Sequence, residues 1–159
     1  MAGNEATRPA PGLDFAFEVR VTVAPPLELG QTPIGRRRII DITGGSVVGP
    51  RLSGRILPGG ADWLVARPDG TAFVDARYTI EADDGGLIFV HNTGYRHAAA
   101  AVLARLAAGE AVAPDDYYFR TTPYFDTAAP AHHWLTHSIF VGNAAREPER
   151  VVISFYLVR

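Results

Sequence analysis

Polar and ionisable side chains recur at alternate positions in four short segments of this chain that otherwise have the pattern of β-strands. These segments are TAFVDARYTIEA (71–82), GLIFVHNTGY (86–95), DYYFRTTPYF (116–125) and HHWLTHSIFV (132–141). Because a strand directs successive side chains to opposite faces, each segment must direct one set of side chains inward and the other outward. Where such groups converge inside a closed sheet, they form a polar pocket for a small molecule. Carboxyl, imidazole and guanidinium groups in that pocket would move protons and stabilise an oxyanion.

Two of the segments place an arginine two residues from another polar side chain, so that both groups share a face. Asp75 and Arg77 form one pair, and Tyr118 and Arg120 form the other. Inside a barrel, Asp75 would orient Arg77 toward a carboxylate, enolate or carbonyl group, and the Tyr118–Arg120 pair would bind an oxyanion or an aromatic ring. On the outer surface the same pairs would be solvated contacts worth about 0–1 kcal/mol. Both interpretations stay open at this point.

Three histidines in HHWLTHSIF suggest a metal site, but their spacing on a strand argues against one. His133 and His137 would share a face at about 13 Å from each other, and His132 would face the other way. We therefore expect no metal ion. A single lumenal His137 is the predicted general base, because imidazole titrates near neutral pH.

Two further positions have a structural and a chemical interpretation. Asp62 follows a tight turn at residues 58–60 and either caps that turn or acts as a buried general acid or base beside Trp63. His91 and Asn92 point to opposite faces, so at most one of them enters the pocket. Asn92 is either a pocket residue or part of a turn.

The alternation of apolar residues predicts the strands that carry these groups. It is strongest over residues 13–24 and 150–158, which predicts a long strand near each end of the chain. Pairing the first strand with the last would close the sheet and remove its edges. Gly44-Gly45 predicts a bulge of the kind that barrels use at corners. The Ala-rich stretch predicts one helix over residues 97–108, which would cover an end of the sheet.

These patterns together predict an all-β fold with one short helix. Residues 13–159 would form a single closed antiparallel β-barrel domain of about 8–9 strands, and residues 1–12 a disordered N-terminal lead-in.

The composition excludes several classes of function. The 159 residues contain no Cys and no Lys, which excludes disulfides, thiolate catalysis, lysine Schiff bases and the P-loop lysine. A net charge of −2 offers no field that would attract nucleic acid or an anionic membrane. No apolar run approaches the ~20 residues that span a bilayer, and no signal-peptide pattern is present. We expect a cytoplasmic protein with neither nucleic acid nor membrane as a partner.

The chain resembles a family of small bacterial and fungal proteins that is catalogued as a domain of unknown function and as an uncharacterised protein family. The stretches that carry the resemblance are GRRRIIDITGGSVVGPRLSGRILPGGADW, VDARYTIEADDGGLIFVHNTG, YYFRTTPYF and WLTHSIFVG. The resemblance implies a calycin-like or allene-oxide-cyclase-like closed barrel. It also implies a signature at Asp62, Trp63, Asp75, Tyr78, Asn92, Arg120 and Trp134. His137 departs from the family pattern, in which we expect Asn.

We predict that the barrel binds a small aromatic or polyketide-like metabolite and isomerises or cyclises it by acid–base chemistry without a cofactor. The alternatives are a carrier or sensor that binds such a metabolite unchanged, and a purely structural module. The expected catalytic residues are His137, Asp62 and Arg120. The expected substrate-binding residues are Trp63, Asp75, Arg77, Asn92, Tyr118 and Trp134. A homodimer is a further possibility that the sequence leaves open.

Overall fold

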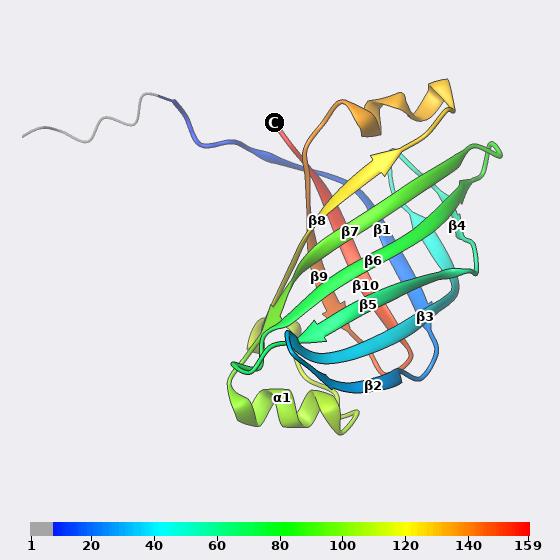
Figure 1. The fold of residues 1–159 in the computed structure, drawn as a ribbon. Helices are drawn as coiled ribbons and strands as arrows, with labels where there is room; N and C mark the ends of the chain where they lie inside the picture. Colours follow the sequence, from blue (N-terminus) through cyan, green and yellow to red (C-terminus); the bar gives the residue numbers. More distant parts are fainter. Residues whose placement is uncertain (1–7) are drawn as a thin grey trace, which may run out of the picture.

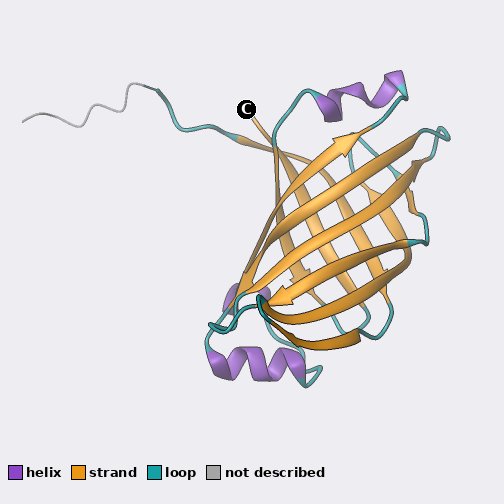
Figure 2. Ribbon diagram, viewed as in Figure 1, coloured by secondary structure: helices purple, strands orange, loops and turns teal. Residues whose placement is uncertain are grey.

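The computed structural model describes residues 8–159 and shows a closed antiparallel β-barrel, as predicted (Figure 1). Residues 1–7 of the predicted lead-in lie outside the described residues, and residues 8–12 have no regular structure. The strands are β1 (Leu13–Val23), β2 (Leu27–Thr32), β3 (Gly35–Val48), β4 (Gly54–Ile56), β5 (Gly60–Ala66), β6 (Ala72–Ala82), β7 (Leu87–His97), β8 (Tyr118–Asp126), β9 (Phe140–Arg146) and β10 (Arg150–Val158). The helical segments are α1 (Ala100–Ala107) and the 3₁₀ helices η1 (Pro114–Asp116) and η2 (Pro130–Thr136) (Figure 2).

The barrel closes through β1, which pairs antiparallel with both β10 and β3. The predicted pairing of the first strand with the last is therefore confirmed. Around the ring the order is β1-β10-β9-β8-β7-β6, and both β4 and β5 lie between β6 and β3. The closed ring thus has eight strand positions, and β2 extends from it as a hairpin arm that pairs with β3. Every strand position of the ring has two neighbours, so the only strand with a free edge among residues 8–159 is β2.

Bulges in β1 and β3 bend the sheet at the closure. The register between β1 and β3 shifts where Thr22 faces Gly44 and Val23 faces Ile42, which confirms the bulge predicted at the double glycine. Gly45 has a φ of 145°, and a Cβ atom there would lie 2.1 Å from the carbonyl oxygen of Arg20. Only glycine therefore allows β3 to approach β1 so closely.

A second bulge, in β1 itself, changes which side chains of that strand are buried. The register with β10 shifts between Phe15 and Phe17, so that Ala16 and Phe17 are both buried. Leu13 and Phe15 are 53% and 44% exposed, although unbroken alternation would bury them. The predicted apolar face of this strand is thus correct only from Phe17 onward.

One end of the barrel is filled by aromatic side chains and covered by η2. Phe125 lies with its ring centroid 5.2 to 5.9 Å from those of Phe17, Phe140 and Phe155. The chain predicted as one strand over residues 132–142 is instead η2 followed by β9. The first residue of η2 is Pro130, and proline is common at the first position of a helix.

The opposite end of the barrel carries α1 and the β9–β10 hairpin (Figure 1). The helix is four residues shorter than the 97–108 predicted and is followed by Gly109, which has a φ of 76°. No helix within residues 8–159 has the length and the apolar character needed to cross a membrane.

Candidate functional site

A cavity of about 930 Å³ occupies the half of the barrel that faces the β9–β10 hairpin. Its rim is formed by residues 23–26, which follow β1, and by residues 147–150 of that hairpin. The cavity has the size of a typical small-molecule site. Its walls mix aliphatic side chains with polar or charged ones from the barrel strands, which include Arg38, Asp62, Tyr78, Asn92, Arg96, Thr121 and Arg146.

Asp62 is the carboxyl group of this cavity. It lies on β5 opposite Ala76, which in turn lies opposite Asn92, so Asp62 and Asn92 belong to one row of inward-facing residues. Its Oδ1 accepts a hydrogen bond of 2.9 Å from the backbone N–H of Asp75. Burial raises the pKa of Asp62 to about 6, although that hydrogen bond and the charge of Arg96 both favour the carboxylate. Asp62 can therefore give up and take back a proton near neutral pH.

Three buried polar groups in the cavity wall have no hydrogen-bond partner within residues 8–159. They are the hydroxyl of Tyr78, the Oδ1 of Asn92 and the Oγ1 of Thr121, in residues that are only 2 to 3% exposed. Leaving such a group unpaired in a dry interior costs about 1–3 kcal/mol. Burial also raises the pKa of Tyr78, which keeps its hydroxyl neutral and able to donate. Their residues line the cavity, so an ordered water or a ligand is the kind of partner that these groups require.

Three arginines carry positive charge into the same space. Burial and the neighbouring charge of Arg146 lower the pKa of Arg96 to about 10, so its guanidinium is still charged at neutral pH. Burial also lowers the pKa of Arg146, and the charge of Arg38 contributes. The buried Nε of Arg96 has no hydrogen-bond partner in the described part of the chain.

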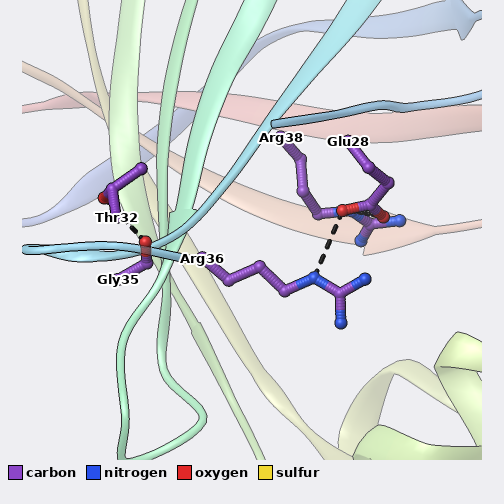
Figure 3. Close-up of polar contacts among 5 residues, drawn as sticks. All are labelled: Glu28, Thr32, Gly35, Arg36 and Arg38. Atoms are coloured by element: carbon purple, nitrogen blue, oxygen red, sulfur yellow. Dashed lines mark hydrogen bonds and ion pairs between the residues drawn. The ribbon is translucent and has the colours of Figure 1, made fainter. Parts of the chain in front are cut away.

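Arg38 differs from the other two arginines because an acidic residue neutralises it. Its Nε lies 2.9 Å from the Oε1 of Glu28, which also accepts from Arg36 at 3.2 Å through Oε2 (Figure 3). Glu28 belongs to β2, so the hairpin arm holds Arg38 in place at the edge of the cavity.

Among the predicted site residues, the structure brings Asp62 and Asn92 together in the cavity. Trp63, Asp75 and Arg77 lie on the outer face of the same strands. There Asp75 contacts Nε2 of His91 at 2.7 Å and Nη2 of Arg77 at 3.7 Å. The lumenal interpretation of the Asp75–Arg77 pair is thus corrected to an outer one, because the inward set of β6 contains the alanines and Tyr78 instead.

Tyr118 and Arg120 also lie on the outer face, which corrects their placement in the lumen. Arg120 donates to the Oδ1 of Asn143 at 2.9 Å and lies 5.5 Å from the centroid of the Tyr118 ring. Phe119 and Thr121 are the inward residues of this strand. The outer pair therefore makes contacts within the chain rather than with the cavity.

Trp134 and His137 lie at the covered end, away from the cavity. The ring of Trp134 packs on Phe140 and lies under the guanidinium of Arg51, 3.9 Å from its Cζ. His137 is an exposed residue at the end of η2. The strand that would have directed His137 into the lumen is not formed, so the imidazole predicted as a general base lies outside the cavity.

The sequence interpretation did not include Arg96, Arg146, Thr121 or Arg38 in the site, and named Tyr78 only as a family position. A signal for Arg96 was available, since residues 92, 94 and 96 share a face and Asn92 had been considered a pocket residue. Within residues 8–159, no three His, Asp or Glu side chains are placed so that they could hold a metal ion.

Comparison with known proteins identifies relatives in bacteria and in a fungus. A UPF0311 protein of Clostridium acetobutylicum is 42% identical over 143 residues, which make up 89% of this chain and 90% of the relative. The crystal structure of a conserved protein from Rhodopseudomonas palustris matches with a TM-score of 0.91 at 38% identity, covering 96% of this chain and 100% of that one.

The fungal similarity is more distant. A hydroalkoxylation enzyme of Penicillium herquei is 33% identical over 85 residues, which cover 53% of this chain and 56% of the enzyme. The crystal structure of an enzyme from the same fungus has the same fold, with a TM-score of 0.72 at 23% identity over 97% of this chain and 99% of that one. A family model described as "Protein of unknown function (DUF3237)" matches residues 11–158. The resemblance inferred from the sequence is thus confirmed, and the chain belongs to the DUF3237 family.

Proposed function

We propose that this protein is an enzyme that closes a ring in a small metabolite, or isomerises it, by proton transfer inside the barrel and without a cofactor. The observation that carries the proposal is Asp62, a carboxyl group with a pKa of about 6 that faces a cavity of about 930 Å³. A proton donor with a pKa near the working pH is the group that general acid catalysis requires.

The unpaired groups around Asp62 support a reaction at an oxygen atom of the substrate. Tyr78 can donate a hydrogen bond to such an oxygen, and Asn92 can accept one from a hydroxyl group. Arg96 supplies positive charge where negative charge develops on the oxygen. Because their backbones are fixed in the sheet, only their side chains need to turn for these buried atoms to reach a substrate.

The similarity to a fungal hydroalkoxylation enzyme suggests which reaction to test first. In an intramolecular hydroalkoxylation, the Asp62 carboxylic acid would donate its proton to one carbon of a C=C bond. The oxygen of a substrate hydroxyl would bond to the other carbon, and the hydroxyl proton would pass to the Asp62 carboxylate. The π bond and the O–H bond break, a C–H and a C–O bond form, and the product is an isomer of the substrate.

The test uses a panel of phenols that carry an alkene in reach of the hydroxyl, including 2-allylphenol and 2-(3-methylbut-2-enyl)phenol. We expect at least one to be converted to a cyclic ether that keeps its mass in water and gains one carbon-bound deuterium in D₂O. Asp62→Asn should lower the rate by about 10²- to 10⁴-fold, the usual contribution of a general acid. Glu81→Gln changes a carboxylate on the outer face of β6, which pairs with Arg55 and does not affect Asp62, and is the matched control, with a rate within about twofold of the wild type.

Two results would contradict this proposal. Equal rates for the wild type and Asp62→Asn would remove Asp62 from the chemistry. Tight binding of panel members without conversion would favour the carrier or sensor function instead. A small-molecule ligand and a homodimer remain predictions.

A further inference from the structure

Resting on the proposed function, we propose that the substrate is a small organic acid whose carboxylate is bound by Arg96 and Arg146 inside the barrel. The carboxylate is a group separate from the hydroxyl and the alkene that react at Asp62. The inference follows from how the charges of the cavity are paired.

Arg96 is partly buried, and its guanidinium lacks an anionic partner. None of the ion pairs among residues 8–159 involves it, and its Nε has no hydrogen bond. Its guanidinium carbon lies 5.7 Å from the centroid of the Phe119 ring, which gives the charge an apolar wall rather than an acceptor. A buried charge is costly unless it is paired, so this site favours an anion.

Arg146 is also partly buried and lines the same cavity. It too is absent from the ion pairs of the described residues, and the hydrogen bond of its backbone N–H goes to the hydroxyl of Tyr117 at 2.9 Å. The positive charge of Arg146 lowers the pKa of Arg96, because the two guanidinium groups repel each other. A carboxylate bound by both would relieve the repulsion and supply the hydrogen bond that the Nε of Arg96 lacks.

The other charges of the cavity do not fulfil this role. Glu28 neutralises Arg38, and Glu147 at the rim pairs with Arg150. Asp62 lies within the electrostatic reach of Arg96 but forms no ion pair with it, and its oxygen already accepts from a backbone N–H. Glu149, the other acid at the rim, is exposed and forms no ion pair within residues 8–159. Among the cavity arginines, Arg96 and Arg146 are therefore the two without an acidic partner in the described residues.

The position of Arg96 also predicts how such an acid lies. On β7, Arg96 is four residues from Asn92 on the same inward face, in the direction of α1 and the open end. An acid held at Arg96 and Arg146 would extend its body inward, past Asp62 and Asn92 toward Tyr78. This orientation brings the reacting atoms to the proton donor and leaves the carboxylate nearer the opening.

The experiment measures binding alone, with compounds that cannot cyclise. Benzoates, cinnamates and straight-chain acids of four to ten carbons are compared with their primary amides by isothermal titration calorimetry at pH 7.5. We expect some acids to bind the wild type at least about tenfold more tightly than the matched amides, as for charge-assisted hydrogen bonds. Arg96→Met should remove that preference. Arg120→Met, from the outer face of the adjacent strand, should keep it.

The proposal is overturned if no acid of the panel binds the wild type more tightly than its amide, including the case in which nothing binds. It is also overturned if folded Arg96→Met keeps the full preference, its folding being checked by circular dichroism. Because no turnover is measured, the result does not depend on Asp62. Acids that bind while Asp62→Asn leaves the turnover of the phenols unchanged would support this inference and refute the proposed function.

Discussion

The inner and outer faces of β6, β7 and β8 carry similar polar residues, but these residues differ in whether they have hydrogen-bond partners. On the outer face, Asp75 pairs with His91 and Arg120 donates to Asn143. On the inner face of the same strands, Tyr78 and Asn92 have buried polar atoms without a partner in residues 8–159. Alternate residues of one strand thus differ in whether their polar atoms have a hydrogen-bond partner within the protein.

Under the proposed function, this difference separates polar groups that contribute to the fold from polar groups kept for a ligand. An exposed pair on the outer face contributes little to stability and costs little to form. A buried unpaired group lowers stability, and such groups persist where they have another use. The inner face of this barrel is therefore expected to gain stability when it is made apolar, and the outer face is not.

The largest effect that tests this comparison is expected in the stability of Asp62→Asn. Because the pKa of Asp62 is raised from 3.8 to about 6, the unfolded chain ionises before the native protein as the pH rises from 4 to 6. The free energy of unfolding therefore falls by up to about 3 kcal/mol over that range, at about 1.4 kcal/mol per pKa unit. Asp62→Asn should thus raise the free energy of unfolding by about this amount at pH 8 and by less at each lower pH. Urea unfolding at several pH values measures it, and a gain that does not depend on pH would contradict the assignment.

The pH dependence of turnover tests the same group in its chemical role. If Asp62 must be protonated to donate, kcat/KM should be highest below pH 6 and fall by about 50-fold between pH 6 and pH 8. Arg96 and Tyr78, the other titratable groups around it, keep their charge over this range, since the pKa of Arg96 is about 10 and that of Tyr78 is raised above its ordinary value. A single descending transition is expected for a cyclising phenol. A rate that rises through pH 6 would make Asp62 a base and would reverse the proposed proton path.

The inner face offers a third test that needs no substrate. Asn92→Leu keeps a similar volume and removes a buried oxygen without a partner, so the free energy of unfolding should rise by about 1 kcal/mol. Asn143→Leu is the matched control, because Asn143 is an exposed asparagine that accepts from Arg120. Equal effects of the two substitutions in urea unfolding would show that the two faces do not differ.

The smallest effect is expected on the outer face. The coupling between Asp75 and His91, whose side chains are 25% and 31% exposed, should be about 0–1 kcal/mol in a double-mutant cycle. Asp75→Ala, His91→Ala and the double variant provide the cycle. A coupling well above this range would mean that the outer cluster stabilises the sheet and would weaken the contrast between the faces.

Most of the fold could be predicted from the sequence, because strand alternation and glycine-rich turns are local signals. The exceptions have local causes as well. Leu13 and Phe15 leave the predicted face because a bulge follows them, and the segment after Pro130 forms a 3₁₀ helix although its apolar residues suggest a strand. Neither the bulge nor the helix changes the order of the strands.

The site was harder to predict, because alternation groups side chains by face but does not say which face is inside. On β6, one face carries Phe73 with Asp75 and Arg77, and the other carries Tyr78 among alanines, so both faces combine polar and apolar residues. The choice between them depends on the closure of the barrel and on the register with β5 and β7. Asp62 and Asn92 were found by their residue types, whereas Arg146 on the short strand β9 gave no such signal.

The aromatic cluster around Phe125 has a kinetic consequence. Since it blocks one end of the barrel, a molecule that enters by the rim at residues 23–26 and 147–150 must leave by the same route. Under the proposed function, product and substrate would then exclude each other from a single passage, so accumulated product should slow the reaction in a purely competitive manner.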